Sequence, residues 1–251
     1  MTGDTILETH GLTKEFKGFI AVDRVNLNVR RGTIHALIGP NGAGKTTVFN
    51  LLTKFLPPTS GAIVYNGTDI TRDKPADVAR RGIIRSFQIS AVFPNLTVLE
   101  NVRIALQRKL GTSFHFWKRE KTLDVLNDRA MALLERVGLQ GFARLSAGEL
   151  AYGRKRTLEI ATTLAMEPEL MLLDEPTAGM GHEDVERVQR LIKEVAAGRT
   201  VLMVEHNMSV VSGICDTITV LQRGSILAEG PYAEVAANPQ VIEAYMGTPH
   251  E

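Results

Sequence analysis

The sequence has little cysteine, little tryptophan and no long apolar run. It contains one cysteine, Cys215, and one tryptophan in 251 residues. A single cysteine excludes an internal disulfide framework and a multi-cysteine metal site, and we expect Cys215 to be a small buried helix residue rather than a catalytic thiol. No uninterrupted apolar stretch reaches the ~20 residues that a membrane span requires, and the polar opening 1–5 is unlike a secretory leader. We therefore expect a cytosolic chain that meets a membrane only through partners.

An excess of charge of one sign is also missing. The chain has 29 Lys and Arg, 28 Asp and Glu and a net charge of +1, so composition gives no support for a nucleic-acid partner. A hydrophobic content of 44% and a charged content of 23% are ordinary for a globular protein. The length suffices for one large domain or two small ones with a sizeable core.

One stretch satisfies the phosphate-binding pattern G-x-x-x-x-G-K-[ST] without a mismatch. It reads Gly39, Pro40, Asn41, Gly42, Ala43, Gly44, Lys45, Thr46 and Thr47. An apolar, strand-like segment at 34–38 precedes it, and apolar residues follow at helical spacing: Val48, Leu51, Leu52, Phe55 and Leu56. The N–H groups of such a loop and the N-terminus of its helix bind phosphate oxygens. We expect Lys45 to reach the β- and γ-phosphates and the Thr46 hydroxyl to ligate Mg²⁺.

Strand-like and helix-like segments alternate on both sides of a helical region. Apolar strands at 170–173 and 201–204 flank a helical pattern at 185–195, which is typical of a parallel sheet. From Thr97 to about Met166 the pattern is almost wholly helical, with one apolar face made of Leu123, Leu126, Ala130, Leu133, Leu134 and Val137. We predict a helical subdomain at 89–166, inserted into a catalytic core formed by 1–88 and 167–251. Arg103, Arg108 and Lys109 are expected on a solvated helix face.

Polar residues follow both of those apolar strands. Asp174 and Glu175 follow the first strand, and His206 comes soon after the second. Parallel strands present their carboxyl ends to the same edge, where ligands bind in such sheets. A carboxylate there holds Mg²⁺, directly or through water, and this role suits Asp174. Glu175 is placed to orient or deprotonate an attacking water, and His206 is within reach of a γ-phosphate.

Together these features resemble the ATP-binding subunits of ABC transporters over essentially the whole chain. The resemblance implies an α/β fold: a P-loop ABC ATPase core with a mostly parallel sheet, an antiparallel β subdomain and the inserted helical subdomain. Residues 39–47 then look like the Walker A loop, and Leu170–Asp174 with Glu175 look like Walker B followed by the catalytic glutamate. ATP and Mg²⁺ are the implied cofactors.

The resemblance also assigns roles to Gln88, His206 and Phe16, and for His206 it agrees with the position after the second strand. Gln88 matches the Q-loop glutamine, which implies contact with Mg²⁺ and sensing of the membrane subunit. His206 matches the switch histidine that recognises the γ-phosphate. Phe16 lies where the family places an aromatic residue that stacks on adenine, although a core position remains an alternative for it.

The family signature, usually Leu-Ser-Gly-Gly-Gln, has two candidates. Residues 145–149 are closer in composition, but Leu145 lies 29 residues before Asp174, whereas Leu150 lies 24 residues before it, as the family pattern requires. We choose the second candidate, which comprises Leu150, Ala151, Tyr152, Gly153 and Arg154. Ala151 then replaces the serine that normally meets the γ-phosphate, while N–H groups at the start of the next helix remain able to hold phosphate.

This variant signature resembles the branched-chain (hydrophobic) amino acid uptake group, as do the segments 93–102, 204–208 and 241–247. Relatives that serve urea, amides or other small solutes look similar. The resemblance implies an importer ATPase on the inner face of the cytoplasmic membrane, bound to integral membrane permease subunits. It also implies a homo- or heterodimer with two ATP molecules between residues 39–47 of one chain and 150–154 of the other.

Three other readings stay open on the sequence. One is an ABC-type ATPase without a membrane partner, such as those of iron–sulfur assembly. Another is a DNA-repair or chromosome ATPase, which would need coiled-coil or zinc-bearing insertions. The last is a non-catalytic nucleotide-gated scaffold. The aromatic and basic run 114–121 fits either a partner contact or a loop packed on its own subdomain.

Overall fold

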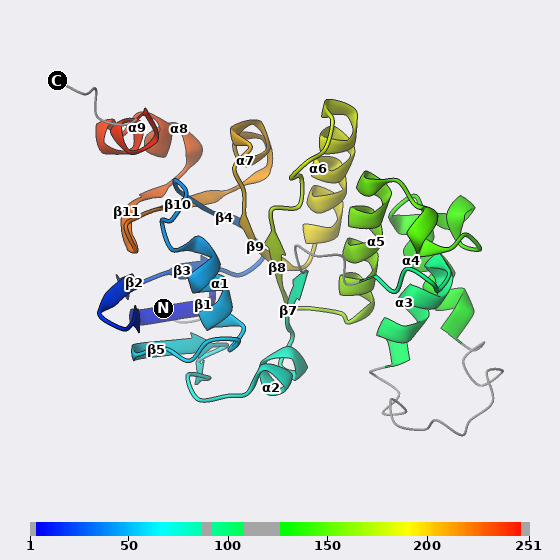
Figure 1. Ribbon diagram of the computed structural model, residues 1–251, viewed down its shortest axis with the longest axis horizontal. Helices are drawn as coiled ribbons and strands as arrows, with labels where there is room; N and C mark the ends of the chain where they lie inside the picture. Colours follow the sequence, from blue (N-terminus) through cyan, green and yellow to red (C-terminus); the bar gives the residue numbers. More distant parts are fainter. Residues whose placement is uncertain (1–3, 87–91, 108–125, 247–251) are drawn as a thin grey trace.

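The computed structural model describes residues 4–86, 92–107 and 126–246. The predictions for Gln88, Arg108, Lys109 and Leu123, and for the run 114–121, concern residues outside these ranges. Two sheets lie side by side in Figure 1, and a group of helices lies on their right.

The central sheet has six strands in the order β11-β10-β4-β9-β8-β7. All neighbours in it are parallel except β10 and β11, which form an antiparallel hairpin. Its strands in chain order are β4 (Ile34–Ile38), β7 (Ile83–Ser86), β8 (Leu170–Asp174), β9 (Thr200–Val204), β10 (Thr217–Gln222) and β11 (Ser225–Gly230).

The apolar runs of the central strands are explained by burial on both faces of the sheet. Along β8, Leu170 and Leu172 belong to one core cluster, whereas Met171 and Leu173 belong to the other. Successive side chains of a strand point to opposite faces, so a strand covered on both sides needs apolar residues at every position.

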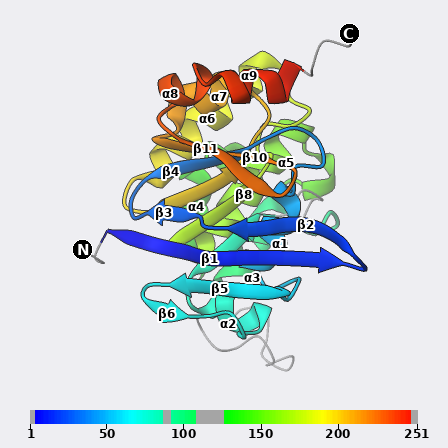
Figure 2. The same cartoon turned by 90° about the vertical axis from the view of Figure 1, so that its left-hand side faces the viewer.

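A second, antiparallel sheet has the order β2-β1-β5-β6, with β3 also paired to β1. Its strands are β1 (Thr5–Phe16), β2 (Phe19–Val25), β3 (Asn28–Arg30), β5 (Ser60–Tyr65) and β6 (Thr68–Asp69). Figure 2 shows this sheet facing the viewer, below β10 and β11. One core cluster joins residues of both sheets to the buried face of α1, so this layer supports the phosphate loop from one side.

Three of the helices form a separate group. Helices α3, α4 and α5 contact one another and lie apart from the antiparallel sheet, at the opposite end of the molecule in Figure 1. The α-helices are α1 (Lys45–Leu52), α2 (Pro75–Arg80), α3 (Val98–Gln107), α4 (Asn127–Arg136), α5 (Tyr152–Ala165), α6 (His182–Ala196), α7 (Met208–Ile214), α8 (Tyr232–Ala236) and α9 (Pro239–Met246). Short 3₁₀ turns at Gln140–Phe142 and Ala147–Glu149 precede α5.

Three local expectations are wrong. Helix α1 ends at Leu52, and Phe55 is 54% exposed instead of continuing the buried face, because the chain turns at Lys54 with a φ of +63°. Arg103 is 9% exposed rather than solvated, and its guanidinium pairs with Glu100 at 3.8 Å. Cys215 is half-buried and is the C-cap that follows α7, rather than a buried residue within a helix. Burial raises the pKa of its thiol to about 12, which keeps the thiol protonated at neutral pH.

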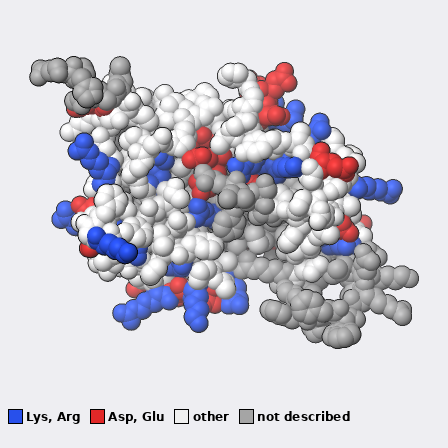
Figure 3. Space-filling model, viewed as in Figure 1, with Lys and Arg blue, Asp and Glu red and all other residues white. Residues whose placement is uncertain are grey.

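Surface charge is mixed on the face drawn in Figure 3, where blue and red side chains are interspersed. Among the helices that the structure describes, none has the length and apolar character that crossing a bilayer demands.

Candidate functional site

The phosphate loop, residues 39–47, connects β4 to α1, and its backbone depends on two glycines. Gly39 has a φ of +148°, and a Cβ there would lie 2.1 Å from the Leu221 carbonyl oxygen. Gly44 has a φ of +101°, and its Cβ would lie 2.6 Å from the Ala21 carbonyl oxygen. Any side chain at either position would collide with a neighbouring strand, so the motif glycines are required by close approach as well as by conformation.

Lys45 is held inside this loop by backbone carbonyls. Its Nζ donates hydrogen bonds to the carbonyl oxygens of Gly39 at 2.7 Å and Pro40 at 2.9 Å. Burial lowers the pKa of the Lys45 ammonium, and the Glu175 carboxylate opposes that shift. The ammonium therefore lies in a partly desolvated position, where a phosphate group would interact with it strongly.

A cavity of about 360 Å³ opens beside the loop. The loop residues Asn41 to Thr47 line it, together with Phe19 and Ala21 of β2 and with Glu175 and His206 from the two strand ends. Residues that are more than 150 positions apart in the sequence thus face one space, because β4, β9 and β8 are adjacent parallel strands that end at the same edge.

Glu175 and His206 contact each other across this cavity. The Nε2 atom of His206 lies 2.9 Å from Oε1 of Glu175. Glu175 has a φ of +48°, in the left-handed region that costs a non-glycine residue about 1–2 kcal/mol. Its N–H donates to the Val204 carbonyl, which extends the β8–β9 pairing by one residue and helps to hold this conformation. Strain of this kind concentrates at functional sites.

Asp174 lies at the end of β8 and is 2% exposed. Its Oδ2 pairs with the Arg85 guanidinium of β7, and Arg85 also donates to Oδ1 of Asn50 on α1 at 2.6 Å. Arg85 further stacks over the Phe49 ring, 5.6 Å from its centroid. Arg85 and Asn50 were not predicted from the sequence, because their contacts follow from the adjacency of β7, β8 and α1.

The residues around Asp174 fit a divalent cation. Its Oδ1 is buried without a hydrogen-bond partner, and a buried carboxylate oxygen normally has one. Thr46, whose hydroxyl is the other predicted oxygen ligand, lies at the first turn of α1 and lines the cavity. Oxygen donors of this type are what Mg²⁺ selects. Within the described ranges, no group of three or more His, Cys, Asp or Glu side chains forms a self-contained metal site.

The two aromatic residues at the β1–β2 turn have different positions. Phe16 ends β1 and is 41% exposed; it lies under the Lys14 ammonium, 5.1 Å from its ring centroid, and does not line the cavity. Phe19 begins β2, is 67% exposed and does line the cavity. The two residues are register partners in the sheet, so a reading of β1 alone could not decide between them.

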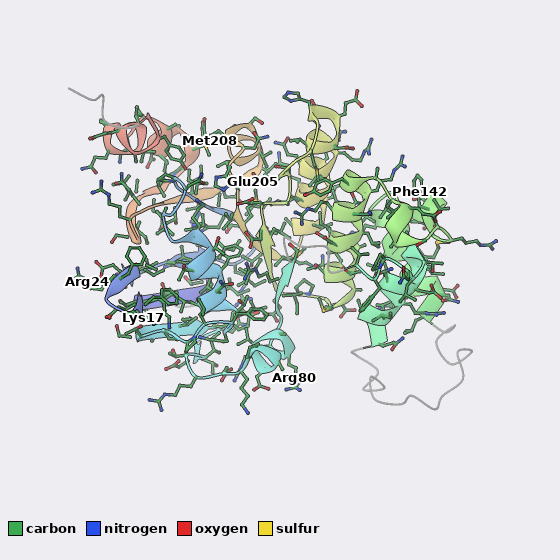
Figure 4. The ribbon with its side chains drawn as sticks, viewed as in Figure 1. Lys17, Arg24, Arg80, Phe142, Glu205 and Met208 are labelled. Carbon is green, nitrogen blue, oxygen red and sulfur yellow. The ribbon has the colours of Figure 1, made fainter. Side chains whose placement is uncertain are left out.

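The predicted signature residues Leu150, Ala151, Tyr152, Gly153 and Arg154 lie outside this cavity. Ala151 is the N-cap of α5, and Ala151, Tyr152 and Arg154 are exposed. Gly153 lies close to α6, where an added Cβ would lie 2.8 Å from Oδ2 of Asp184. The guanidinium of Arg154 stacks on the Phe142 ring at 4.1 Å; Figure 4 shows Phe142 among the helices, far from the phosphate loop.

Two more residues near the loop were not anticipated. Burial raises the pKa of the Tyr245 phenol on α9 to about 12, and the backbone of Gly39 opposes that shift. Glu205, the residue after β9, is 2% exposed and accepts four hydrogen bonds at the site. Its place directly before His206 was the only signal for it in the sequence.

Comparison with known proteins identifies the family. The sequence model of the family described as ABC transporter matches residues 22–178. The chain belongs to the ABC transporter family. A second family model, described as branched-chain amino acid ATP-binding cassette transporter, matches residues 225–251.

Individual relatives agree with this assignment over nearly the full length. The high-affinity branched-chain amino acid transport ATP-binding protein BraF of Pseudomonas aeruginosa is 41% identical over 252 residues, which cover 96% of this chain and 98% of that protein. The crystal structure of a nucleotide-free ATP-binding cassette from an ABC transporter superposes with a TM-score of 0.85 at 31% identity, covering 97% of this chain and 100% of the other. A dimeric cassette bound to ADP and Pi has a TM-score of 0.76 at 25% identity, with 90% and 98% covered.

These matches confirm the predicted ABC ATPase fold, with its parallel and antiparallel sheets, and the ATPase class of this cassette. The catalytic and binding roles of individual residues stay predictions. The division of the chain into a catalytic core and a helical subdomain, with boundaries at 88 and 167, also stays a prediction.

Proposed function

We propose that this cassette binds and hydrolyses ATP to drive an importer of branched-chain or other hydrophobic amino acids. The observation that carries the ATPase part is the meeting of Lys45, Glu175 and His206 in one cavity beside the phosphate loop. The cargo part rests on the similarity to BraF over 96% of the chain and on the C-terminal match at 225–251.

Each cavity residue has a distinct part in the proposed chemistry. Lys45 exchanges its two carbonyl partners for phosphate oxygens, and the loop N–H groups hold the remaining oxygens. Thr46 and Asp174 would hold Mg²⁺, which neutralises phosphate charge when bound, with Gln88 as a further ligand. Glu175 accepts a proton from the attacking water, and His206 contacts the γ-phosphate while it orients Glu175 through their 2.9 Å contact.

The exposed signature residues support a site completed by a second chain. Leu150–Arg154 lie outside the cavity, and a related cassette is dimeric with ADP and Pi. In the proposed dimer, the N-terminus of α5 from one chain faces the γ-phosphate held by the other. ATP then stabilises the closed dimer through contacts that ADP lacks, so hydrolysis shifts the equilibrium toward the open form. We place the dimer on the inner face of the cytoplasmic membrane, bound to permease subunits.

A substitution of Glu175 tests the ATPase assignment. Glu175→Gln keeps the size of the side chain but removes the base, so we expect hydrolysis to fall by about a hundredfold or more with ATP affinity retained. Hydrolysis at the wild-type rate would show that Glu175 is not the base.

The cargo is tested by reconstitution with the permease subunits. ATP-dependent uptake of labelled leucine, isoleucine and valine is expected, and uptake of urea or amides instead would correct the cargo class.

A further inference from the structure

Glu205 is a buried carboxylate to which the proposed chemistry gives no part. It follows β9 directly, and Figure 4 shows it near the middle of the molecule, where β9 leads toward α7. The residue is 2% exposed. A carboxylate is almost never buried to this extent unless hydrogen bonds or a cation compensate its desolvation, so its partners indicate what it is there to hold.

The partners of Glu205 belong to two different segments of the site. Its Oε1 accepts from the Thr177 N–H at 3.0 Å and from the Thr177 hydroxyl at 2.5 Å. Its Oε2 accepts from the N–H of His206 at 2.9 Å and of Asn207 at 3.1 Å. One oxygen therefore holds the segment after β8, and the other holds the segment after β9.

These two segments carry the two polar side chains that meet in the cavity. Thr177 lies two residues after Glu175, whose backbone has the left-handed φ of +48°. His206 is bound through its own N–H. The carboxylate fixes both backbones at positions from which the Glu175 and His206 side chains reach each other at 2.9 Å.

We propose that Glu205 is a positioning residue for ATP hydrolysis, because its carboxylate ties the backbone after Glu175 to the backbone of His206 and so sets the geometry of that pair. This inference rests on the proposed function, which gives Glu175 and His206 their parts. Glu205 is not among the residues that line the cavity beside the phosphate loop. Its loss should therefore lower kcat and leave nucleotide affinity nearly unchanged.

The amide variant separates the carboxylate from its volume. In Glu205→Gln only one side-chain oxygen can accept, so either the Thr177 pair or the His206 and Asn207 pair loses its acceptor. We expect kcat of the full-length chain to fall by about tenfold or more, since hydrogen bonds to a charged group are the strong ones. KM for ATP should stay within about twofold. Glu169→Gln, at the opposite end of β8, is the matched control and should retain wild-type kcat.

A second, milder variant tests the same proposal if the Glu205→Gln protein folds poorly. Thr177→Val removes one hydroxyl donor, keeps the backbone N–H bond and nearly preserves the side-chain shape, so a kcat lower by about threefold is expected. Because both changes act on one link, the double variant should be no slower than Glu205→Gln alone. Hydrogen exchange supplies a measurement besides activity: peptides covering 175–178 and 205–208 should exchange faster in Glu205→Gln than in the control.

The possible outcomes distinguish a failure of this inference from a failure of the proposed function. Wild-type kcat in both Glu205→Gln and Thr177→Val, with Glu175→Gln inactive, would overturn the positioning role and leave the proposed function standing. A parallel loss of ATP affinity and kcat would assign Glu205 a purely structural part and also overturn the inference. Hydrolysis by Glu175→Gln at the wild-type rate would contradict both the proposed function and the positioning role of Glu205.

Discussion

The phosphate loop and the signature segment have opposite structural characters. The loop is built into the centre of the molecule: Gly39 and Gly44 touch carbonyls of other strands, Lys45 is buried, and a cavity adjoins them. The signature residues Ala151, Tyr152 and Arg154 are exposed at the start of α5, and none of them lines that cavity.

This difference indicates which steps each region can control within one chain. A single chain already holds the groups expected to bind phosphate, so loop variants should change nucleotide binding directly. Signature variants should act only where a second chain closes over the nucleotide, and they should leave binding to one chain unchanged.

The largest effect is expected at the loop lysine. Lys45→Ala removes the ammonium that we expect to bind the phosphates, and hydrolysis should fall by about a hundredfold or more, as for other groups that stabilise charge at a reacting centre. Nucleotide affinity of the isolated chain, measured by calorimetry, should fall as well. Lys193→Ala, an exposed lysine on α6, is the control. Unchanged affinity in Lys45→Ala would contradict the proposed loop function.

The signature glycine should affect hydrolysis without affecting that affinity. In Gly153→Ala the new Cβ would lie 2.8 Å from Oδ2 of Asp184, so that carboxylate must move and its charge shifts at the start of α5. Hydrolysis should fall by up to about a hundredfold, since a misplacement of roughly 1 Å at a reacting centre can cost that much.

The control for that variant is Gly141→Ala, where a Cβ has no neighbour within 4 Å. If Gly153→Ala lowered the nucleotide affinity of the single chain as strongly as its hydrolysis, the two regions would not be separable.

The adenine partner is tested by comparing two phenylalanines. Phe19 lines the cavity and Phe16 does not, so Phe19→Ala should weaken ATP binding by about fivefold or more, since stacking of one base on an aromatic side chain is worth about 1–3 kcal/mol. Phe16→Ala should change it less. The opposite order would restore the assignment that the family pattern suggests.

The smallest effect is expected from restoring the signature serine. Ala151→Ser adds one hydroxyl at the N-cap of α5, and one hydrogen bond is worth about 1 kcal/mol, so hydrolysis should rise by no more than about fivefold. Binding to the isolated chain should not change. A gain that appears at concentrations where the chain is monomeric would place Ala151 in the same site as its own phosphate loop.

Much of the fold could be predicted because its signals are local. The apolar runs at 170–173 and 201–204 became β8 and β9, and the 39–47 loop lies between a strand and a helix as its motif requires. Arg103 shows where that reasoning fails: a charged residue on a polar stretch was expected in solvent, but Glu100 and Asn127 bind it at a buried position. The contact with Asn127 depends on a neighbouring helix, α4, that the local pattern does not include.

The residues of the candidate site likewise include some that local motifs predict and some that they do not. Lys45, Asp174 and Glu175 could be named because each lies inside a short motif with fixed spacing. Arg85 could not, because its function as a partner of Asp174 and Asn50 follows from the adjacency of β7, β8 and α1. The position of Phe19 in the cavity depends likewise on the pairing of β1 with β2.

The class of the protein can be inferred from the sequence alone, since the glycine loop, the acidic strand end and their spacing specify phosphate chemistry before any folding is considered. Two features follow only from the folded arrangement: which side chains share the cavity, and the link that Glu205 makes between the segments of Glu175 and His206. The physical reason is the range of the interactions: motifs and periodicities act between near neighbours along the chain. Hydrogen bonds to a buried carboxylate depend on which strand ends the sheet brings together.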